Sequence, residues 1–196
     1  MKKMKIAGLA LVFCMKLSAQ QPDLQLRYLK PSATIAFSGA RIFTNNVVHE
    51  GIIEDASGGS FVSLHVTDKN PKHILVSIEE LNGYPTVGTI TVRILKMTAF
   101  DISFDPVGGM SDVFGGGMAT SNAAWTFIDN PGNDYYELVS TAPVQAHGTD
   151  IIALTITKKP TTCINTTQSM TARITPGSGG ENNFSNNVSV INLTTN

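Results

Sequence analysis

The stretch from Ile74 to Phe104 constrains the fold of this chain most, because apolar residues recur in it at every second position. On either side of a turn at Asn82-Gly83, the recurring residues are Ile74, Val76, Ile78, Ile90, Val92 and Ile94. A period of two is typical of β-strands that bury one face and expose the other, which places Leu75, Ser77 and Glu79 on the wet face. The stretch therefore predicts successive β-strands joined by short turns.

The first 19 residues have the layout of a secretory signal peptide. A lysine-rich start precedes an apolar run that ends at Met15, and Ser18 and Ala19 then supply small residues. That run is about ten residues long, whereas a membrane-spanning helix needs about twenty, so no transmembrane helix is expected in the mature chain. We expect residues 1–19 to be removed and the protein to be exported to the extracellular space or cell surface, with the periplasm as an alternative.

The composition argues against several classes of partner and site. The chain is 42% hydrophobic and 15% charged, with a net charge of −1. Nucleic-acid binding needs a basic excess and membrane-surface binding needs a polybasic face, so neither partner is expected. Cys14 lies in the predicted signal peptide, which leaves Cys163 without an internal disulfide partner. No base or basic side chain adjoins Cys163 to activate it as a nucleophile.

Short alternating segments recur along the rest of the chain, with turn residues about every eight to twelve positions. No helical hydrophobic pattern follows the signal peptide, which argues against nucleotide-binding α/β folds. We therefore predict an all-β protein, an antiparallel immunoglobulin-like β-sandwich of nine or more short strands. Residues 60–196 are expected to form the sandwich, and residues 20–59 to add strands and turns that pack on it.

Two local expectations follow from turn chemistry. The strand at residues 60–66 is expected to form an antiparallel hairpin with the strand that starts near His73, because only the turn-forming residues 68–71 separate them. The glycine-rich segment 107–122 lacks the lysine and the following helix that phosphate-binding loops have. It is expected to be a flexible surface loop.

Four motifs carry a family resemblance. They are Asn82-Gly83-Tyr84-Pro85, Ala99-Phe100-Asp101-Ile102, the segment from Asn122 to Trp125, and Gly177-Ser178-Gly179-Gly180-Glu181 with Asn186-Asn187. Together they resemble the immunoglobulin-like modules of bacterial adhesin-like surface and secreted proteins, of the bacterial cell-adhesion-related domain type. The resemblance covers most of residues 61–193. It implies a sandwich that serves as a spacer, ligand-presenting repeat or docking unit rather than as an enzyme.

Calcium is the metal that the residue pattern accommodates best. One turn offers the hard oxygen ligands of Asp129, Asn130, Asn133 and Asp134, and a second turn offers those of Glu181, Asn182 and Asn183. The same residue types are also what ordinary turns are made of. These residues are therefore calcium candidates, and no metal or cofactor is assigned.

Aromatic side chains are the candidates for a sugar-binding platform. Tyr84, Tyr135 and Tyr136 are available, and Tyr135 and Tyr136 must point to opposite faces of a strand, so one of them at most is exposed. Trp125 is expected in the core, as a lone tryptophan on a sandwich strand usually is.

No group of residues has the pattern of a catalytic site. The histidines are scattered and lack a paired metal-ligand spacing: His49, His65, His73 and His147. No serine lies in a G-x-S-x-G elbow. Two carboxylate pairs are close in sequence, Glu79 with Glu80 and Asp101 with Asp105, as a hydrolytic site needs. Glu79 and Asp101 alternate with apolar residues, however, and fit the wet face of a sheet better. We expect no catalytic residues and no enzyme activity.

Three functional hypotheses stay open. The first is an exported, non-enzymatic surface or envelope module that mediates adhesion or contact with a protein or surface-glycan partner. The second is a structural subunit that self-associates through strand edges, because an unpaired edge is a template for another chain. The third is a glycan-binding or calcium-dependent binding protein.

Overall fold

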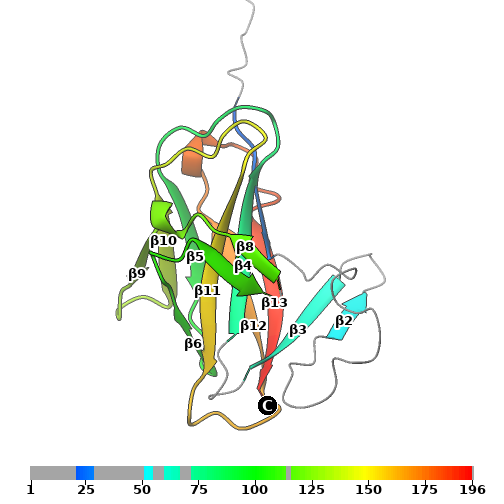
Figure 1. Ribbon diagram of the computed structural model, residues 1–196. Coiled ribbons are helices and arrows are strands. Elements are labelled where there is room, and N and C mark those ends of the chain that lie inside the picture. The colour runs from blue at the N-terminus through cyan, green and yellow to red at the C-terminus, as the bar shows by residue number, and fades with distance from the viewer. Residues whose placement is uncertain (1–20, 29–50, 55–59, 67–71, 114–115, 196) are drawn as a thin grey trace, which may run out of the picture.

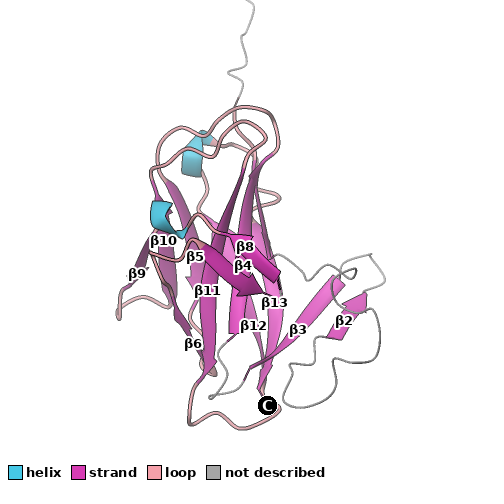
Figure 2. Cartoon of the chain, viewed as in Figure 1, coloured by secondary structure: helices cyan, strands magenta, loops and turns pink. Residues whose placement is uncertain are grey.

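Two stacked β-sheets form the protein, as the computed structural model shows (Figures 1 and 2). The structure describes residues 21–28, 51–54, 60–66, 72–113 and 116–195. The predicted signal peptide and the segments expected between residues 29 and 50 lie outside these described residues. Within them, the helical elements are two 3-10 turns, at Asn122–Ala124 and Ser178–Gly180. The prediction of an all-β sandwich is confirmed.

The first sheet has four strands, and all of its neighbouring strands are antiparallel. In spatial order they are β1 (Leu24–Tyr28), β4 (Lys72–Glu80), β11 (Thr149–Lys158) and β6 (Phe100–Ser103). The central strands β4 and β11 are long and rich in branched apolar residues, which suit a half-buried pleated surface.

The second sheet has seven strands. In spatial order they are β2 (Gly51–Glu54), β3 (Ser60–Val66), β13 (Val188–Thr195), β12 (Thr167–Ile174), β5 (Ile90–Leu95), β10 (Tyr135–Ser140) and β9 (Thr126–Asp129). Its pairs are antiparallel except β3 and β13, which run parallel. A separate hairpin joins β7 (Met110–Val113) to β8 (Gly116–Ala119).

The core lies between the two sheets and is filled by the inward-facing residue of each alternating pair. Its largest fully buried side chains include Phe100, Leu138, Leu154, Met170 and Ile174. The predicted alternation is thus present in the structure, where the strands of the sandwich bury every second side chain against the opposite sheet.

The expected hairpin between residues 60–66 and the strand at His73 is wrong. β3 pairs with β2 and β13, whereas β4 pairs with β1 and β11. The two strands adjoin in sequence but belong to different sheets. A short connection predicts a hairpin only when both strands stay in one sheet, and here the chain crosses between the layers.

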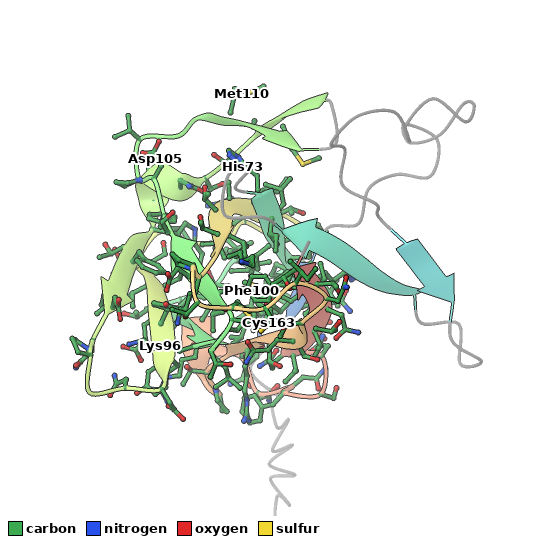
Figure 3. All side chains as sticks on the ribbon, turned by 90° about the horizontal axis from the view of Figure 1, so that it is seen from below. His73, Lys96, Phe100, Asp105, Met110 and Cys163 are labelled. Atoms are coloured by element: carbon green, nitrogen blue, oxygen red, sulfur yellow. The ribbon has the colours of Figure 1, made fainter. Side chains whose placement is uncertain are left out.

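The wet face expected around Leu75 and Ser77 is also wrong, because both side chains are buried. The glycine-rich segment is not simply a loop: it contains the β7–β8 hairpin, and β7 contacts β4. Figure 3 shows the chain passing from Asp105 to Met110 on the side of the sheet where His73 lies. Part of the outer face of the four-stranded sheet, over β4, is therefore covered by its own chain.

Asn122 anchors this cover to the sheet. Its Nδ2 donates to the carbonyl oxygens of Asp105 at 2.8 Å and Ala153 at 3.0 Å, and its Oδ1 accepts from the Ala153 N–H at 2.8 Å. The Ser121 N–H also donates to the Ile151 carbonyl at 2.7 Å. Asn122 thus supplies a side-chain substitute for strand pairing on β11.

Both long sides of the sandwich are closed. On one side, Leu24, Leu26 and Tyr28 of β1 direct their N–H groups away from β4, to Glu181 Oε2 (3.1 Å), the Asn186 carbonyl (3.2 Å) and Ser189 Oγ (3.0 Å). On the other side, an aromatic stack of Phe104, Phe127 and Tyr136 has ring centroids 5.8 and 5.2 Å apart. These contacts fix the two sheets to one another at their margins.

Candidate functional site

The outer face of the seven-stranded sheet carries several of the exposed apolar side chains of the described residues. We call the outward-facing side chains of β9, β10, β5, β12 and β13 the open face. Across its centre the strand register aligns one row of residues: Ile128, Glu137, Arg93, Arg173 and Val188. Each strand thus contributes one side chain to a flat band that crosses the sheet.

The charges in this row are unbalanced. Arg93 Nε pairs with Glu137 Oε1 at 2.9 Å, and the Arg93 guanidinium lies 4.5 Å from the centroid of the Tyr135 ring. Arg173 stands directly opposite Arg93 on the next strand, and no hydrogen bond or ion pair within the described residues engages it. Like charges that face each other across strands are unfavourable, so the open face carries an uncompensated cation.

Apolar side chains surround this cation. Val188 and Val190 on β13 are each 50% exposed, and Leu95 on β5 is 48% exposed. The register pairs Val188 with Arg173 and Val190 with Thr171. The open face therefore combines half-exposed aliphatic groups with a guanidinium that no other described side chain engages.

A second feature is a group of carboxylates at the end of the sandwich where β1 begins and β4 ends. Glu80 is buried there, and five backbone N–H groups donate to its carboxylate. Those of Asp23 (3.3 Å) and Asn82 (2.9 Å) reach Oε1; those of Gly83 (2.8 Å), Tyr84 (3.1 Å) and His147 (2.9 Å) reach Oε2. Burial alone raises the pKa of Glu80, but these hydrogen bonds outweigh it and hold the pKa below its ordinary value. Glu80 thus fastens three chain segments together.

Glu181 is the second buried carboxylate at this end. Its Oε2 accepts from the Leu24 N–H at 3.1 Å, and its Oε1 accepts from Asn187 Nδ2. Burial raises the pKa of Glu181 to about 7, against the lowering effect of these two hydrogen bonds, and nearby Asp23 raises it further. The carboxyl groups of Asp23 and Glu181 are thus neighbours at the point where β1 contacts β13.

The predicted calcium turn is arranged around a lysine. Lys96 Nζ lies 2.6 Å from Asp129 Oδ1 and donates to the Asn130 carbonyl at 2.8 Å. Asn130 Oδ1 accepts from the Gly132 N–H at 3.0 Å, and the Asn133 N–H donates to the Asn130 carbonyl at 3.0 Å. Calcium binding at Asp129, Asn130, Asn133 and Asp134 stays a prediction, and a calcium ion there has to displace Lys96.

The three candidate tyrosines do not form a common platform. Tyr136 faces the core and stacks on Phe127, whereas Tyr135 faces outward beneath the Arg93 guanidinium. Tyr84 is half-buried in the loop after β4. Trp125 is buried, and its Nε1 donates to Asp150 Oδ2 at 3.2 Å.

The described residues contain no metal centre built from histidine, cysteine and acidic side chains alone. No three His, Cys, Asp or Glu side chains among them are arranged to hold a metal ion. Cys163 is exposed and free. In the described chain, no helix is long and apolar enough to span a membrane.

Sequence reasoning missed the roles of Glu80 and Glu181. A signal for Glu80 was available, because it continues the inward phase of Ile74, Val76 and Ile78 just before the Asn82-Gly83 turn. Glu181 was noted only as an oxygen ligand in its own turn, and nothing local indicated its contact with Leu24, which lies 157 residues away in sequence.

Comparison with known proteins finds similarity in structure alone. No protein-family model matches the chain, and no curated protein matches it by sequence. Among solved structures, a CARDB domain from Pyrococcus furiosus, crystallised in complex with di-metal ions, is similar with a TM-score of 0.43 and 12% identity. The match covers 90% of this chain and 94% of that one.

Two further structures illustrate the range of similar folds. A cohesin module of a Clostridium perfringens family 33 glycoside hydrolase has a TM-score of 0.40 and 14% identity, over 76% of this chain and 95% of that one. The major pilin subunit of Bacillus cereus has a TM-score of 0.41 and 5% identity, over 76% of this chain and 48% of that one. These are β-sandwich modules of the kind that the sequence motifs resemble, and at these identities they describe a fold and assign no activity.

Proposed function

We propose that this protein is a non-enzymatic contact module that binds a protein partner through the open face, at the cell surface or in the envelope. The observation that supports this proposal is the unequal cover of the two sheets. The β7–β8 segment lies over β4, whose outward side chains Leu75 and Ser77 are buried, while the open face keeps half-exposed valines beside Arg173, which no described residue engages.

The chemistry of the open face favours a partner with a carboxylate flanked by apolar groups. Arg173 has unused donors that match a carboxylate bidentately, and Arg93 opposite it adds positive charge. Val188 and Val190 offer apolar area that a partner would remove from water. Sugar stacking is less suited to this face, because Arg93 already lies over the ring of its tyrosine, Tyr135.

Assembly through strand edges has less support. Three N–H groups on the outer edge of β1 already donate to Glu181, Asn186 and Ser189, so this edge offers few donors to another strand. The edge strands β6 and β9 have four residues each, which is short for a template.

Site-specific photocrosslinking tests the proposal. A photoreactive residue at Val190 is expected to crosslink to a protein in the envelope of the producing cells, and Arg173→Glu is expected to abolish that product. The same photoreactive residue at Val107, which is 86% exposed on the covered side, serves as the control. Equal crosslinking from Val107, or crosslinking from Val190 that persists in Arg173→Glu, contradicts the proposal.

A stability control separates binding from folding. Arg173→Glu replaces a like-charge pair with an attractive one, so the melting temperature is expected to be unchanged or slightly higher. Loss of the crosslink in a fully folded variant then reports on the contact surface alone.

A further inference from the structure

The end of the sandwich where β1 begins concentrates negative charge without a matching cation. Asp23, Glu80 and Glu181 gather there, and none of them pairs with a Lys, Arg or His side chain within the described part of the chain. Glu80 is satisfied by backbone N–H groups. Asp23 accepts from the side-chain amides of Asn183 and Asn186, so it has hydrogen-bond donors but no cationic side chain among the described residues beside it. It is close enough to raise the pKa of Glu181.

Two amide side chains beside these carboxylates have buried oxygen atoms without partners. Asn187 is 1% exposed; its Nδ2 donates to Glu181, and its Oδ1 has no hydrogen-bond donor. Asn186 Nδ2 donates to Asp23 Oδ1 at 3.0 Å, and its Oδ1 is likewise buried and unpaired. A buried acceptor without a donor is costly and rare, so each of these oxygens is available to a bound water or ion.

The unpaired amide oxygens of Asn186 and Asn187 and the carboxylates of Asp23 and Glu181 are all oxygen acceptors. A water molecule would supply donors to the amide oxygens, but it would leave the two carboxylates uncompensated. A divalent cation would coordinate the unpaired amide oxygens, and it would also balance the negative charge of the two carboxylates. Hard carboxylate and carbonyl oxygens select calcium over zinc, which prefers nitrogen and sulfur ligands.

We propose that Asp23, Glu181 and the side-chain oxygens of Asn186 and Asn187 bind one calcium ion at this end of the sandwich. Four side chains, with one or both oxygens of each carboxylate, supply four to six ligands, and water completes the six to eight that calcium takes. Two of the four ligand side chains are amides. The site therefore does not need three acidic, histidine or cysteine side chains, a grouping that the described residues lack. Asp23 precedes β1 and Asn187 precedes β13, so the ion joins the starts of the first and last strands.

Thermal unfolding of the purified full chain tests this site. Calcium chloride is expected to raise the melting temperature relative to chelator by about 5–10 °C at a hundredfold excess over its Kd. Magnesium chloride is expected to have a smaller effect, because Mg²⁺ is smaller and demands octahedral geometry. Isothermal titration calorimetry of the wild-type chain is expected to give one calcium ion per chain.

Matched variants locate the ion. Glu181→Gln and Asp23→Asn are expected to lose the calcium-dependent shift, whereas Asp129→Asn, in the turn that Lys96 occupies, is expected to keep it. The calcium-dependent change within each variant is compared, so a lower baseline stability does not obscure the result. An unchanged melting temperature with no titration heat in the wild type overturns the proposal, and so does a shift that survives Glu181→Gln but not Asp129→Asn.

Discussion

Glu80 Oε2 accepts a hydrogen bond of 2.9 Å from the backbone N–H of His147, a residue 67 positions further along the chain. The same carboxylate holds the turn that contains Gly83, whose backbone lies against the His147 imidazole. One buried side chain therefore joins the loop after β4 to the loop before β11. Three predictions concern this end of the molecule and its cover, and a fourth concerns the edge of the four-stranded sheet.

Glu80→Gln is expected to lower the free energy of unfolding by about 2–3 kcal/mol at pH 7, because an amide cannot accept all five N–H groups and brings its own donors against them. The folded pKa of Glu80 lies below its unfolded value, so the stabilisation is present above the unfolded pKa and is lost as pH falls through the folded one. The difference between wild type and variant should therefore shrink below about pH 4.5. Urea unfolding at several pH values measures it; a difference that is constant down to pH 3 contradicts the assignment.

Gly83→Ala is expected to destabilise the protein more than Gly88→Ala. Both glycines have left-handed φ angles, +81° and +85°, so both substitutions carry a similar backbone cost of about 1 kcal/mol. A Cβ added at Gly83 would lie 2.7 Å from His147 Nε2, whereas a Cβ added at Gly88 would have no neighbouring atom within 4 Å. The excess loss for Gly83→Ala, measured by thermal unfolding, reports on the contact with His147, and equal losses would show that the ring moves aside freely.

Asn122→Ala is expected to cost about 2–3 kcal/mol, because it leaves the Ala153 N–H and two carbonyl oxygens without their partner. Hydrogen exchange at the amides of Ser121 and Ala153 should accelerate as the cover over β4 and β11 loosens. Asn133→Ala is the control, because no hydrogen bond of the Asn133 side chain lies within the described structure; it should change stability by less than about 0.5 kcal/mol. Unchanged exchange in Asn122→Ala would show that the cover is held by other contacts.

Removal of residues up to 28 is expected to expose the edge of β4 and cause association. β1 pairs with β4 along its whole length, from Leu24 with Glu80 to Tyr28 with Val76, and it buries Leu24 and Leu26. An uncovered edge beside apolar side chains is a template for another chain. Light scattering should show larger species for the truncated chain than for the full chain at the same concentration. A stable truncated monomer would mean that β1 protects no edge.

The alternating pattern by itself determined the class of the protein. Residues such as Ile90, Val92 and Ile94 predict strands with one buried face whatever their neighbours are, because the period of two is a property of the extended backbone. The turn residues between such segments likewise determined that the strands are short and numerous. Trp125 was placed in the core on its apolar character, and the structure buries it.

The tertiary structure decided which faces are wet and where the polar groups meet. Leu75 and Ser77 are buried because a segment some thirty residues later folds over them, and no periodicity within β4 contains that information. β3 pairs with β13 rather than β4 because sheet membership depends on how the layers stack. Asp23 lies near one end of the described chain and Glu181 and Asn187 near the other, and only the contact between the first and last strands brings these residues to one place.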